Sequence, residues 1–492
     1  MNSFGGSRKL VAAAGVATLL GLLLAVPGPE APVAAAPRGA RSFAWNRDAY
    51  WNELQARFEA SERTDCSETE APLMREMTAL EAGIVQLGVS RVGPDALMLD
   101  SLENRFFGIA PMVAACPARL PDYARVQTAL RESIKEQSRR WDMTTATART
   151  RIYQSLYGSR AALEEAMLHH PARVPDVLAG TGAQSLTPAA AIEGITIHSG
   201  DILVSRGGYP TSALISRGSD YPGNFSHVAL VHVDSASGFI SVIEAHIERG
   251  VAVSSGEEYL SDKKRRILIL RPRADLPEIV SDPMLPHRAA SQMLARARAE
   301  RIPYDFTMDY GDPSRLFCSE VASSVYRERG LQLWTGLSTI SAPGLRRWLS
   351  SFGVRHFETQ EPSDLEYDPQ LVVVAEWRDP ASLASDHVDN AVIDAMLEGA
   401  ERGDALHYDW YRLPPARLAK AYSSIMNLFG GVGPIPEGMS ARSALRNQAF
   451  SARQRYIAAE VAARSSVWQN EHGYPPPYWA LLAIARDVTA AI

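Results

Sequence analysis

Cysteine is scarce in this sequence, with three residues among 492. A fold held together by a dense set of disulfides is therefore excluded, and a chain of this length can form hydrophobic cores without them. Close pairs of metal ligands of the CxxC or HxxxH type are also absent. Zinc held by Cys318 and His227 with His232 or His246 is a competing interpretation, but without such pairs we expect no metal site.

A large excess of charge of one sign is also absent. The net charge of −6 is small for this length, and without a basic excess we expect no nucleic-acid partner. The contents of 46% hydrophobic and 22% charged residues are typical of a soluble globular protein. The length predicts two or three domains.

Long apolar runs are absent except at the N-terminus. The run Leu10–Val26 is uncharged, follows a basic pair and precedes the small residues 33–36. This order is typical of a secretory signal peptide, so we expect cleavage at about residues 35–40. An uncleaved anchor within residues 1–36 is the alternative. We therefore expect an exported protein of the periplasm or cell envelope, with membrane association only through its N-terminal segment.

Three cysteines in an oxidising compartment leave one unpaired. Cys66 and Cys116 lie in the same helical region and are the candidates for a disulfide. Cys318 lies far away in a different kind of sequence. An unpaired cysteine is either reactive or buried as a small apolar side chain, and the cysteine count does not decide between the two.

Hydrophobic periodicity divides the mature chain into three regions. Residues 41–175 have apolar residues at three- and four-residue spacing, which is typical of helices, and residues 386–492 return to this pattern. Residues 195–380 combine short β-like runs with two helices, which predicts an α+β domain with an antiparallel sheet. The small-residue stretch 175–192 is predicted to be a linker.

The predicted helices are Asp48–Ala60, Ala71–Leu87, Tyr123–Arg139, Thr147–Leu168, Arg288–Arg301 and a helix from Cys318 to Gly330. The predicted strands are Ile195–Ile197, Asp201–Val204, His227–Val233, Phe239–Ala245, Val251–Val253, Ile267–Leu270, Val354–Glu358 and Leu371–Trp377. The polar, glycine-containing segment Ser205–Asn224 is predicted to be a mobile lid or a substrate-selecting loop.

Three residues of the central region have the right types and positions for nucleophilic catalysis. Cys318 begins a predicted helix, where free N–H groups favour a thiolate and could bind an oxyanion. His227 begins a predicted strand and is a suitable base near neutral pH. Counting through the hairpin places Glu244 roughly opposite residue 228, close enough to orient His227. Each residue alone is more often structural, but together they predict a Cys-His-Glu site. A serine nucleophile is not expected, since no GxSxG motif is present.

Several short motifs of the central region occur in a distinctive order. They are Gly200-Asp201-Ile202-Leu203, Ser226-His227-Val228-Ala229-Leu230-Val231, Val242-Ile243-Glu244-Ala245, Gly250-Val251, Ile302-Pro303-Tyr304-Asp305-Phe306 and Phe317-Cys318-Ser319-Glu320-Val321. The set resembles the YiiX/YebB-like group of circularly permuted NlpC-type cysteine hydrolases, in the papain-like superfamily. The resemblance covers residues 195–335, and the order His, Glu, Cys is that of the permuted branch.

The resemblance implies a role for each matching residue. Cys318 is expected to be the nucleophile, His227 the general base and Glu244 the residue that orients it. Tyr304 and Asp305 are expected near the active site, in a structural or substrate-facing position. Glu320, in the first helical turn, is expected to hold that helix in place.

The function we expect is hydrolysis of an amide bond in a cell-wall peptide, through an acyl-enzyme intermediate and without a cofactor. One alternative is a lipid-directed acyl hydrolase or acyltransferase that uses the same triad. The other is a non-catalytic interaction protein of the cell envelope, because helical flanks account for much of the chain.

Overall fold

The computed structural model describes residues 24–26, 33, 35–37, 39–44, 48–61, 63–170, 175–180 and 182–492. Most of residues 1–36, for which a signal peptide or anchor is predicted, lie outside these ranges. In the described part of the chain, no helix is both long enough and apolar enough to cross a bilayer.

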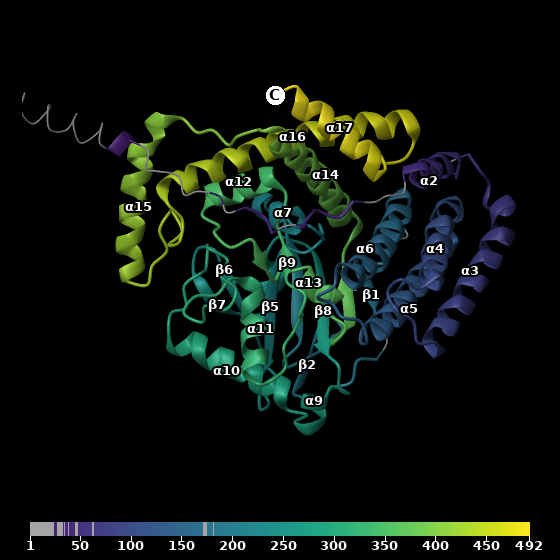
Figure 1. The fold of residues 1–492 in the computed structure, drawn as a ribbon, viewed down its shortest axis with the longest axis horizontal. Coiled ribbons are helices and arrows are strands. Elements are labelled where there is room, and N and C mark those ends of the chain that lie inside the picture. The colour runs from purple at the N-terminus through teal and green to yellow at the C-terminus, as the bar shows by residue number, and fades with distance from the viewer. Residues whose placement is uncertain are drawn as a thin grey trace, which may run out of the picture.

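The N-terminal region is a group of helices that pack side by side at one end of the molecule (Figure 1). They are α2 (Asp48–Ser61), α3 (Cys66–Val89), α4 (Leu97–Ala115), α5 (Leu120–Ser138) and α6 (Ala146–His169). The sequence predicts four of these helices and misses α4, because Pro111 suggests an interruption. Pro111 lies inside α4, where most apolar side chains are buried and Phe106 is completely buried. Tertiary packing here overrides the local preference.

A disulfide joins two of these helices. Cys66 begins α3, and Cys116 follows the last residue of α4. Cys318 is a free, buried cysteine.

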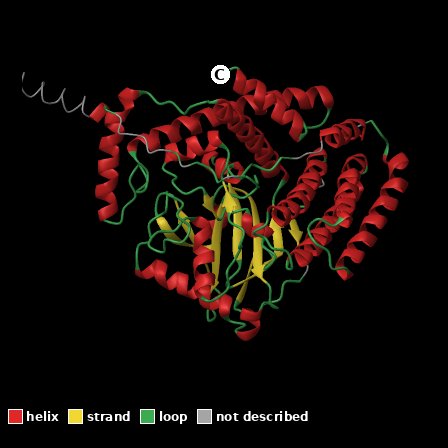
Figure 2. Cartoon of the chain, viewed as in Figure 1, coloured by secondary structure: helices red, strands yellow, loops and turns green. Residues whose placement is uncertain are grey.

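The central region is built on a seven-stranded antiparallel sheet in the order β1-β11-β8-β4-β5-β6-β7. The strands are β1 (Val177–Ala179), β4 (Ile202–Gly207), β5 (His227–Val233), β6 (Ile240–His246), β7 (Gly250–Ser255), β8 (Lys264–Pro272) and β11 (Leu371–Trp377). Figure 2 shows these strands grouped in the middle of the molecule with helices around them. The strands are rich in Val, Ile and Leu, and most of their side chains are buried, as expected of a sheet covered by helices.

One linker and one strand are predicted wrongly. The predicted linker 175–192 contains β1, which pairs with β11, and β2 (Ala189–Ile192), which pairs with β3 (Ile195–His198) in a separate small sheet. The predicted strand Val354–Glu358 is reduced to β10 (Glu358–Thr359), paired with β9 (Ser338–Thr339). Its first residues do not join a sheet, because the N–H groups of Arg355 and His356 donate to the carbonyl of Thr307.

The predicted loop Ser205–Asn224 contains helix α7 (Pro210–Arg217). Proline at its first position fits the fixed backbone angle of a helix start. Ala213 and Leu214 are buried in a core with α12 (Pro343–Phe352) and α14 (Pro380–Arg402). The prediction of a continuous loop is therefore wrong, since the middle of the segment is a packed helix.

Helices cover the sheet and continue to the C-terminus. Helices α10 (Leu285–Ala299) and α11 (Cys318–Glu328) contact β5, and α14 contacts β8. Short helices α8 (Gly256–Ser261), α9 (Pro277–Ser281) and α13 (Asp364–Tyr367) lie in the connections. The C-terminal region comprises α14, the 3-10 helix η3 (Trp410–Arg412), α15 (Leu413–Leu428), α16 (Ala441–His472) and α17 (Tyr478–Ala490).

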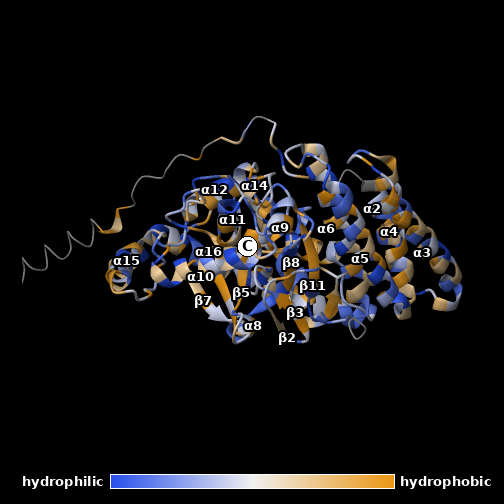
Figure 3. Cartoon of the chain, turned by 90° about the horizontal axis from the view of Figure 1, so that it is seen from below, coloured by the Kyte–Doolittle hydropathy of each residue, from blue (hydrophilic) through white to orange (hydrophobic). Residues whose placement is uncertain are grey.

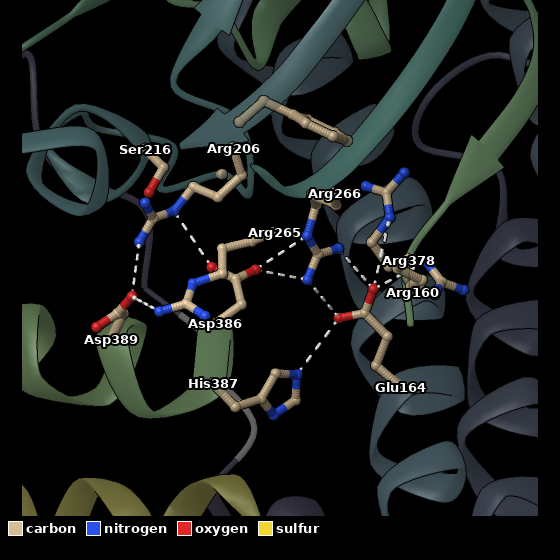
Figure 4. A network of polar contacts seen from close by, with 12 residues as sticks. Arg160, Glu164, Arg206, Ser216, Arg265, Arg266, Arg378, Asp386, His387 and Asp389 are labelled. Atoms are coloured by element: carbon tan, nitrogen blue, oxygen red, sulfur yellow. Dashed lines mark hydrogen bonds and ion pairs between the residues drawn. The ribbon is translucent and has the colours of Figure 1, made fainter. Parts of the chain in front are cut away.

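A buried network of charged side chains connects the three regions (Figure 4). Arg266 of β8 donates to Glu164 of α6 at 2.6 Å and to Asp386 of α14 at 2.9 Å. Arg378 also donates to Glu164, at 3.0 Å, and Arg206 of β4 lies 3.2 Å from Asp386. Each of these side chains is at most 2% exposed. Buried charges of this kind are tolerated only when they are paired, so the network holds the flanking helices against the sheet.

Candidate active site

Cys318 is the first residue of α11, at the N-terminal end of a buried helix. The preceding residue, Phe317, has an extended backbone and starts the helix. Glu320 accepts hydrogen bonds from the N–H of Phe317 at 3.3 Å and of Gly311 at 2.9 Å. Glu320 therefore ties the helix start to the preceding loop, and the free N–H groups of the first turn lie beside the thiol.

The thiol lies next to the start of β5. The Sγ of Cys318 is 4.0 Å from the carbonyl oxygen of Ser226, the residue that precedes His227. Cys318 is 5% exposed, whereas the side chain of His227 is 21% exposed. The histidine is thus the more accessible partner of a nearly buried thiol.

His227 and Glu244 contact each other across the β5–β6 hairpin. Glu244 pairs with Ala229, so the predicted pairing with residue 228 is wrong by one position. Because side chains alternate along a strand, the observed register places Glu244 on the same face as Ala229 and His227. The Nε2 of His227 lies 2.7 Å from the Oε2 of Glu244.

Both neighbours of His227 favour its protonated form. Burial lowers the pKa of His227, but hydrogen bonds with Cys318 and Glu244, and the charges of both groups, outweigh it and raise the pKa to about 9. An imidazolium between a thiol and a carboxylate stabilises the thiolate form of the cysteine. The arrangement is therefore suited to nucleophilic attack followed by proton donation.

A second histidine shares the carboxylate. The Nε2 of His246 lies 3.3 Å from the Oε1 of Glu244, and its ring centroid is 6.1 Å from that of His227. Burial opposes ionisation of Glu244, but the hydrogen bonds with His227 and His246 hold its pKa well below the usual range. The sequence analysis considered His246 only as a zinc ligand, although strand alternation places residues 244 and 246 on one face.

The geometry does not favour the competing zinc site. Among the residues that the structure describes, no group of three His, Cys, Asp or Glu side chains is arranged to hold a metal ion. His232 points to the opposite face of β5 from His227, and its ring stacks on that of His287 at 5.2 Å.

Tyr304 and Asp305 occupy different positions relative to the thiol. Asp305 accepts hydrogen bonds from the N–H and hydroxyl of Thr307 and from the N–H of Asp309, so it organises the loop that it begins. Burial, followed by the charge of Cys318, raises the pKa of Tyr304 well above its usual value. Tyr304 is therefore a neutral phenol within electrostatic range of the thiol, packed edge-on against Phe306 at 5.2 Å.

Glu361 is a further carboxyl group near the thiol, and the sequence analysis missed it. It is 5% exposed, and burial together with the charges of Asp364 and Cys318 raises its pKa well above the usual value. Residues close to Glu361 in the sequence connect the segment 360–363 to the site. Ser363 accepts from the N–H of Phe225 at 3.1 Å, and Gln360 accepts from Ser323 of α11.

Comparison with known proteins gives one family and one solved structure. Residues 196–375 match the family described as permuted papain-like amidase enzyme, YaeF/YiiX, C92 family. The crystal structure of the metalloprotein YiiX from Escherichia coli O157:H7 matches with 20% identity and a TM-score of 0.30. The match covers 37% of this chain and 97% of that chain. No curated protein matches this chain.

Proposed function

We propose that this chain, whose residues 196–375 match the permuted papain-like amidase family, hydrolyses an amide bond in a cell-envelope peptide with Cys318 as the nucleophile. The observation that carries the proposal is the position of His227, which interacts with Glu244 on one side and Cys318 on the other. This order of groups is the one that activates a thiol and orients its base.

The proposed reaction has two steps. The Cys318 thiolate attacks the amide carbonyl, and the free N–H groups at the start of α11 stabilise the oxyanion. The C–N bond breaks when His227 donates its proton to the leaving amine, which leaves a thioester on Cys318. His227 then takes a proton from water, the resulting hydroxide attacks the thioester, and the free acid and the thiolate are released.

The remaining residues of the site have supporting roles in this proposal. Glu244 holds the imidazole in position and stabilises its charge. Glu320 fixes the start of α11, which carries the thiol. Asp305 fixes the loop that it begins, which precedes α11 in the chain. The reaction needs no cofactor.

Two properties of the chain support a cell-envelope substrate. The matched family is described as an amidase family, and the N-terminal sequence pattern predicts export. An exported amidase encounters peptide amides of the cell wall. A lipid amide or ester is the second candidate, supported by the aromatic side chain of Tyr304, which lies within electrostatic range of the thiol and packs against Phe306.

The test compares wild-type protein with Cys318→Ala on cell-wall peptides and on N-acyl lipids, with release of the amine as the readout. We expect hydrolysis of the peptides and a loss of about 10³-fold or more in the variant. Hydrolysis that persists in Cys318→Ala would show that another group is the nucleophile. Cleavage of the lipids alone would favour the second candidate, and no cleavage of either would favour the non-catalytic interaction protein.

A further inference from the structure

Helix α15 and the turn before it present an apolar surface that the described part of the chain leaves exposed, which we call the α15 face. Its exposed residues are Trp410, Tyr411, Leu418, Tyr422, Ile425, Leu428 and Phe429. Leu428 and Phe429 are 83% and 84% exposed, which is unusual for large apolar side chains in a folded protein. Most members recur at spacings of three, four or seven residues, so they share one side of the helix.

The opposite side of α15 is attached to the protein. Leu413 is buried in a core with Ile435, Met439 and Leu445, and Phe306 packs against the same core. The apolar character of the α15 face is therefore not required for packing α15 onto the fold. Figures 1 and 3 show that α15 lies at the end of the molecule away from the N-terminal helices, where hydrophobic segments are conspicuous in Figure 3.

The segment that carries the α15 face has basic residues but no acidic ones, and Asp409 and Glu437 flank it. From Trp410 to Pro436 the sequence contains no Asp or Glu, but it contains Arg412, Arg417 and Lys420. A positive, apolar surface with Trp and Tyr is complementary to the headgroup region of an anionic bilayer, where these aromatic side chains are favoured. A second copy of the same surface would bring like charges together.

The N-terminal apolar run ends against the same helix. The guanidinium of Arg417 donates to the carbonyl oxygens of Leu24 and Val26, at 2.7 Å each. The run Leu10–Val26 is long and uncharged. Leu24 and Val26, at the end of that run, therefore lie beside α15.

From these observations we infer that the α15 face is a docking surface for an anionic lipid bilayer. The helix lies in the plane of the interface with Leu418, Ile425 and Phe429 inserted among the acyl chains. Tyr411 and Tyr422 lie at headgroup depth, and Arg412 contacts lipid phosphate. This surface lies outside the hydrolase domain and adds to any attachment through the N-terminal segment.

The test is hydrogen–deuterium exchange of the full chain, with and without vesicles of mixed phosphatidylcholine and phosphatidylglycerol. We expect vesicles to slow amide exchange across residues 410–432 by about tenfold or more, with no change in α3. Reading exchange segment by segment separates this surface from the N-terminal run, which could itself bind vesicles.

Two variants make the test specific. Leu418→Glu with Ile425→Glu places charges on the α15 face, at positions 63% and 55% exposed, so the fold tolerates them. We expect this variant to lose the vesicle-induced protection of α15. The matched control is the double variant Val85→Glu/Val89→Glu on α3, at positions 70% and 77% exposed. We expect this control to keep the vesicle-induced protection of α15.

Three results would overturn the inference. The first is no protection of residues 410–432 by vesicles, as expected if the N-terminal run covers the α15 face. The second is protection that appears without vesicles as the protein concentration rises, which would identify a second copy as the occupant. The third is protection that survives in the Leu418→Glu/Ile425→Glu variant.

Discussion

At the scale of single residues, Glu361 raises the question of how a carboxyl group is tolerated near a thiolate. Burial and the negative charges of Asp364 and Cys318 favour its neutral form, and only Arg149 opposes them. Two negative groups in one buried site would repel each other strongly. A protonated Glu361 avoids this repulsion and leaves a neutral hydrogen-bond donor in the site.

This account predicts that Glu361→Gln is nearly silent. Glutamine has the same shape, is neutral and can donate a hydrogen bond, so we expect kcat/KM to change by less than about tenfold, whereas loss of an acid–base group costs about 10²–10⁴-fold. Steady-state kinetics on the substrate of the wild-type protein measures the change. A loss of about 10²-fold or more would mean that Glu361 works in its ionised form.

The second residue-scale prediction concerns Glu244→Gln and pH. The pKa of His227 is raised to about 9, so the proton that it donates to the leaving group is present below that pH and is lost as the pH rises through it. Removing the charge of Glu244 takes away one cause of the raised pKa of His227. We expect the falling limb of kcat/KM to move to lower pH, with a loss of rate of about 10²-fold.

A pH–rate profile of Glu244→Gln beside wild type and His246→Asn checks this prediction. His246→Asn removes the other partner of Glu244 and keeps the contact with His227, so its falling limb should stay near that of wild type. If the limb does not move in Glu244→Gln, Glu244 does not set the proton affinity of His227.

The residues of the site that sequence reasoning found are those with local signals. Cys318 is recognisable at a helix start, and His227 and Glu244 belong to one hairpin in which strand alternation brings them together. Glu361 carries no such signal, because it reaches the site through the coil between β10 and α13. Its role depends on burial and on neighbours far away in sequence, which local patterns do not encode.

At the scale of elements, the disulfide between Cys66 and Cys116 fastens α3 to α4. It closes a loop with a sequence separation of 50 residues. We expect the double variant Cys66→Ser/Cys116→Ser to lose about 2–4 kcal/mol of stability in the N-terminal helices, because the unfolded chain gains freedom. Urea unfolding followed by helical circular dichroism measures the loss.

The same double variant should keep the reactivity of Cys318, since the disulfide belongs to the N-terminal helices and Cys318 is free. An unchanged unfolding midpoint would mean that packing alone holds α3 and α4 together. A loss of Cys318 reactivity would mean that these helices shape the active site.

Element prediction succeeded where periodicity and burial agree. The apolar residues of α6 at three- and four-residue spacing and the apolar runs of β5 and β11 were recognisable in the sequence. Helices α4 and α7 were missed since proline and glycine suggested loops, yet packing stabilises both helices. The pairing of β1 with β11 depends on a distant partner, whereas β2 pairs with the next strand, β3, and was missed because its small residues suggested a linker.

At the scale of the whole molecule, the buried charge network joins helices and sheet. Burial opposes ionisation of Glu376, but Arg160 and Arg378 hold its pKa at about 2. Because this value is below the ordinary one, the stabilisation is present above about pH 4.3 and is lost as the pH falls toward 2. The network therefore links assembly of the three regions to the ionisation of a few carboxylates.

Arg266→Met tests the network. The change removes a positive charge that Glu164 and Asp386 share, so their negative charges are less well paired in a buried site. We expect a loss of about 3–5 kcal/mol of stability. The matched control is Arg486→Met, whose partner Glu398 is on the surface and whose own side chain is 52% exposed, with an expected loss below about 1 kcal/mol. Equal unfolding midpoints for the two variants would contradict a structural role for the network.

The central claim is that Cys318 is an activated thiol held by His227, and its rate of modification tests this claim most directly. Wild type, His227→Gln and glutathione are treated with iodoacetamide at neutral pH, and the modified cysteine is identified by peptide mapping. The account predicts that Cys318 reacts faster than glutathione and that His227→Gln removes the advantage. A Cys318 that reacts no faster than glutathione, or equally fast without His227, would contradict it.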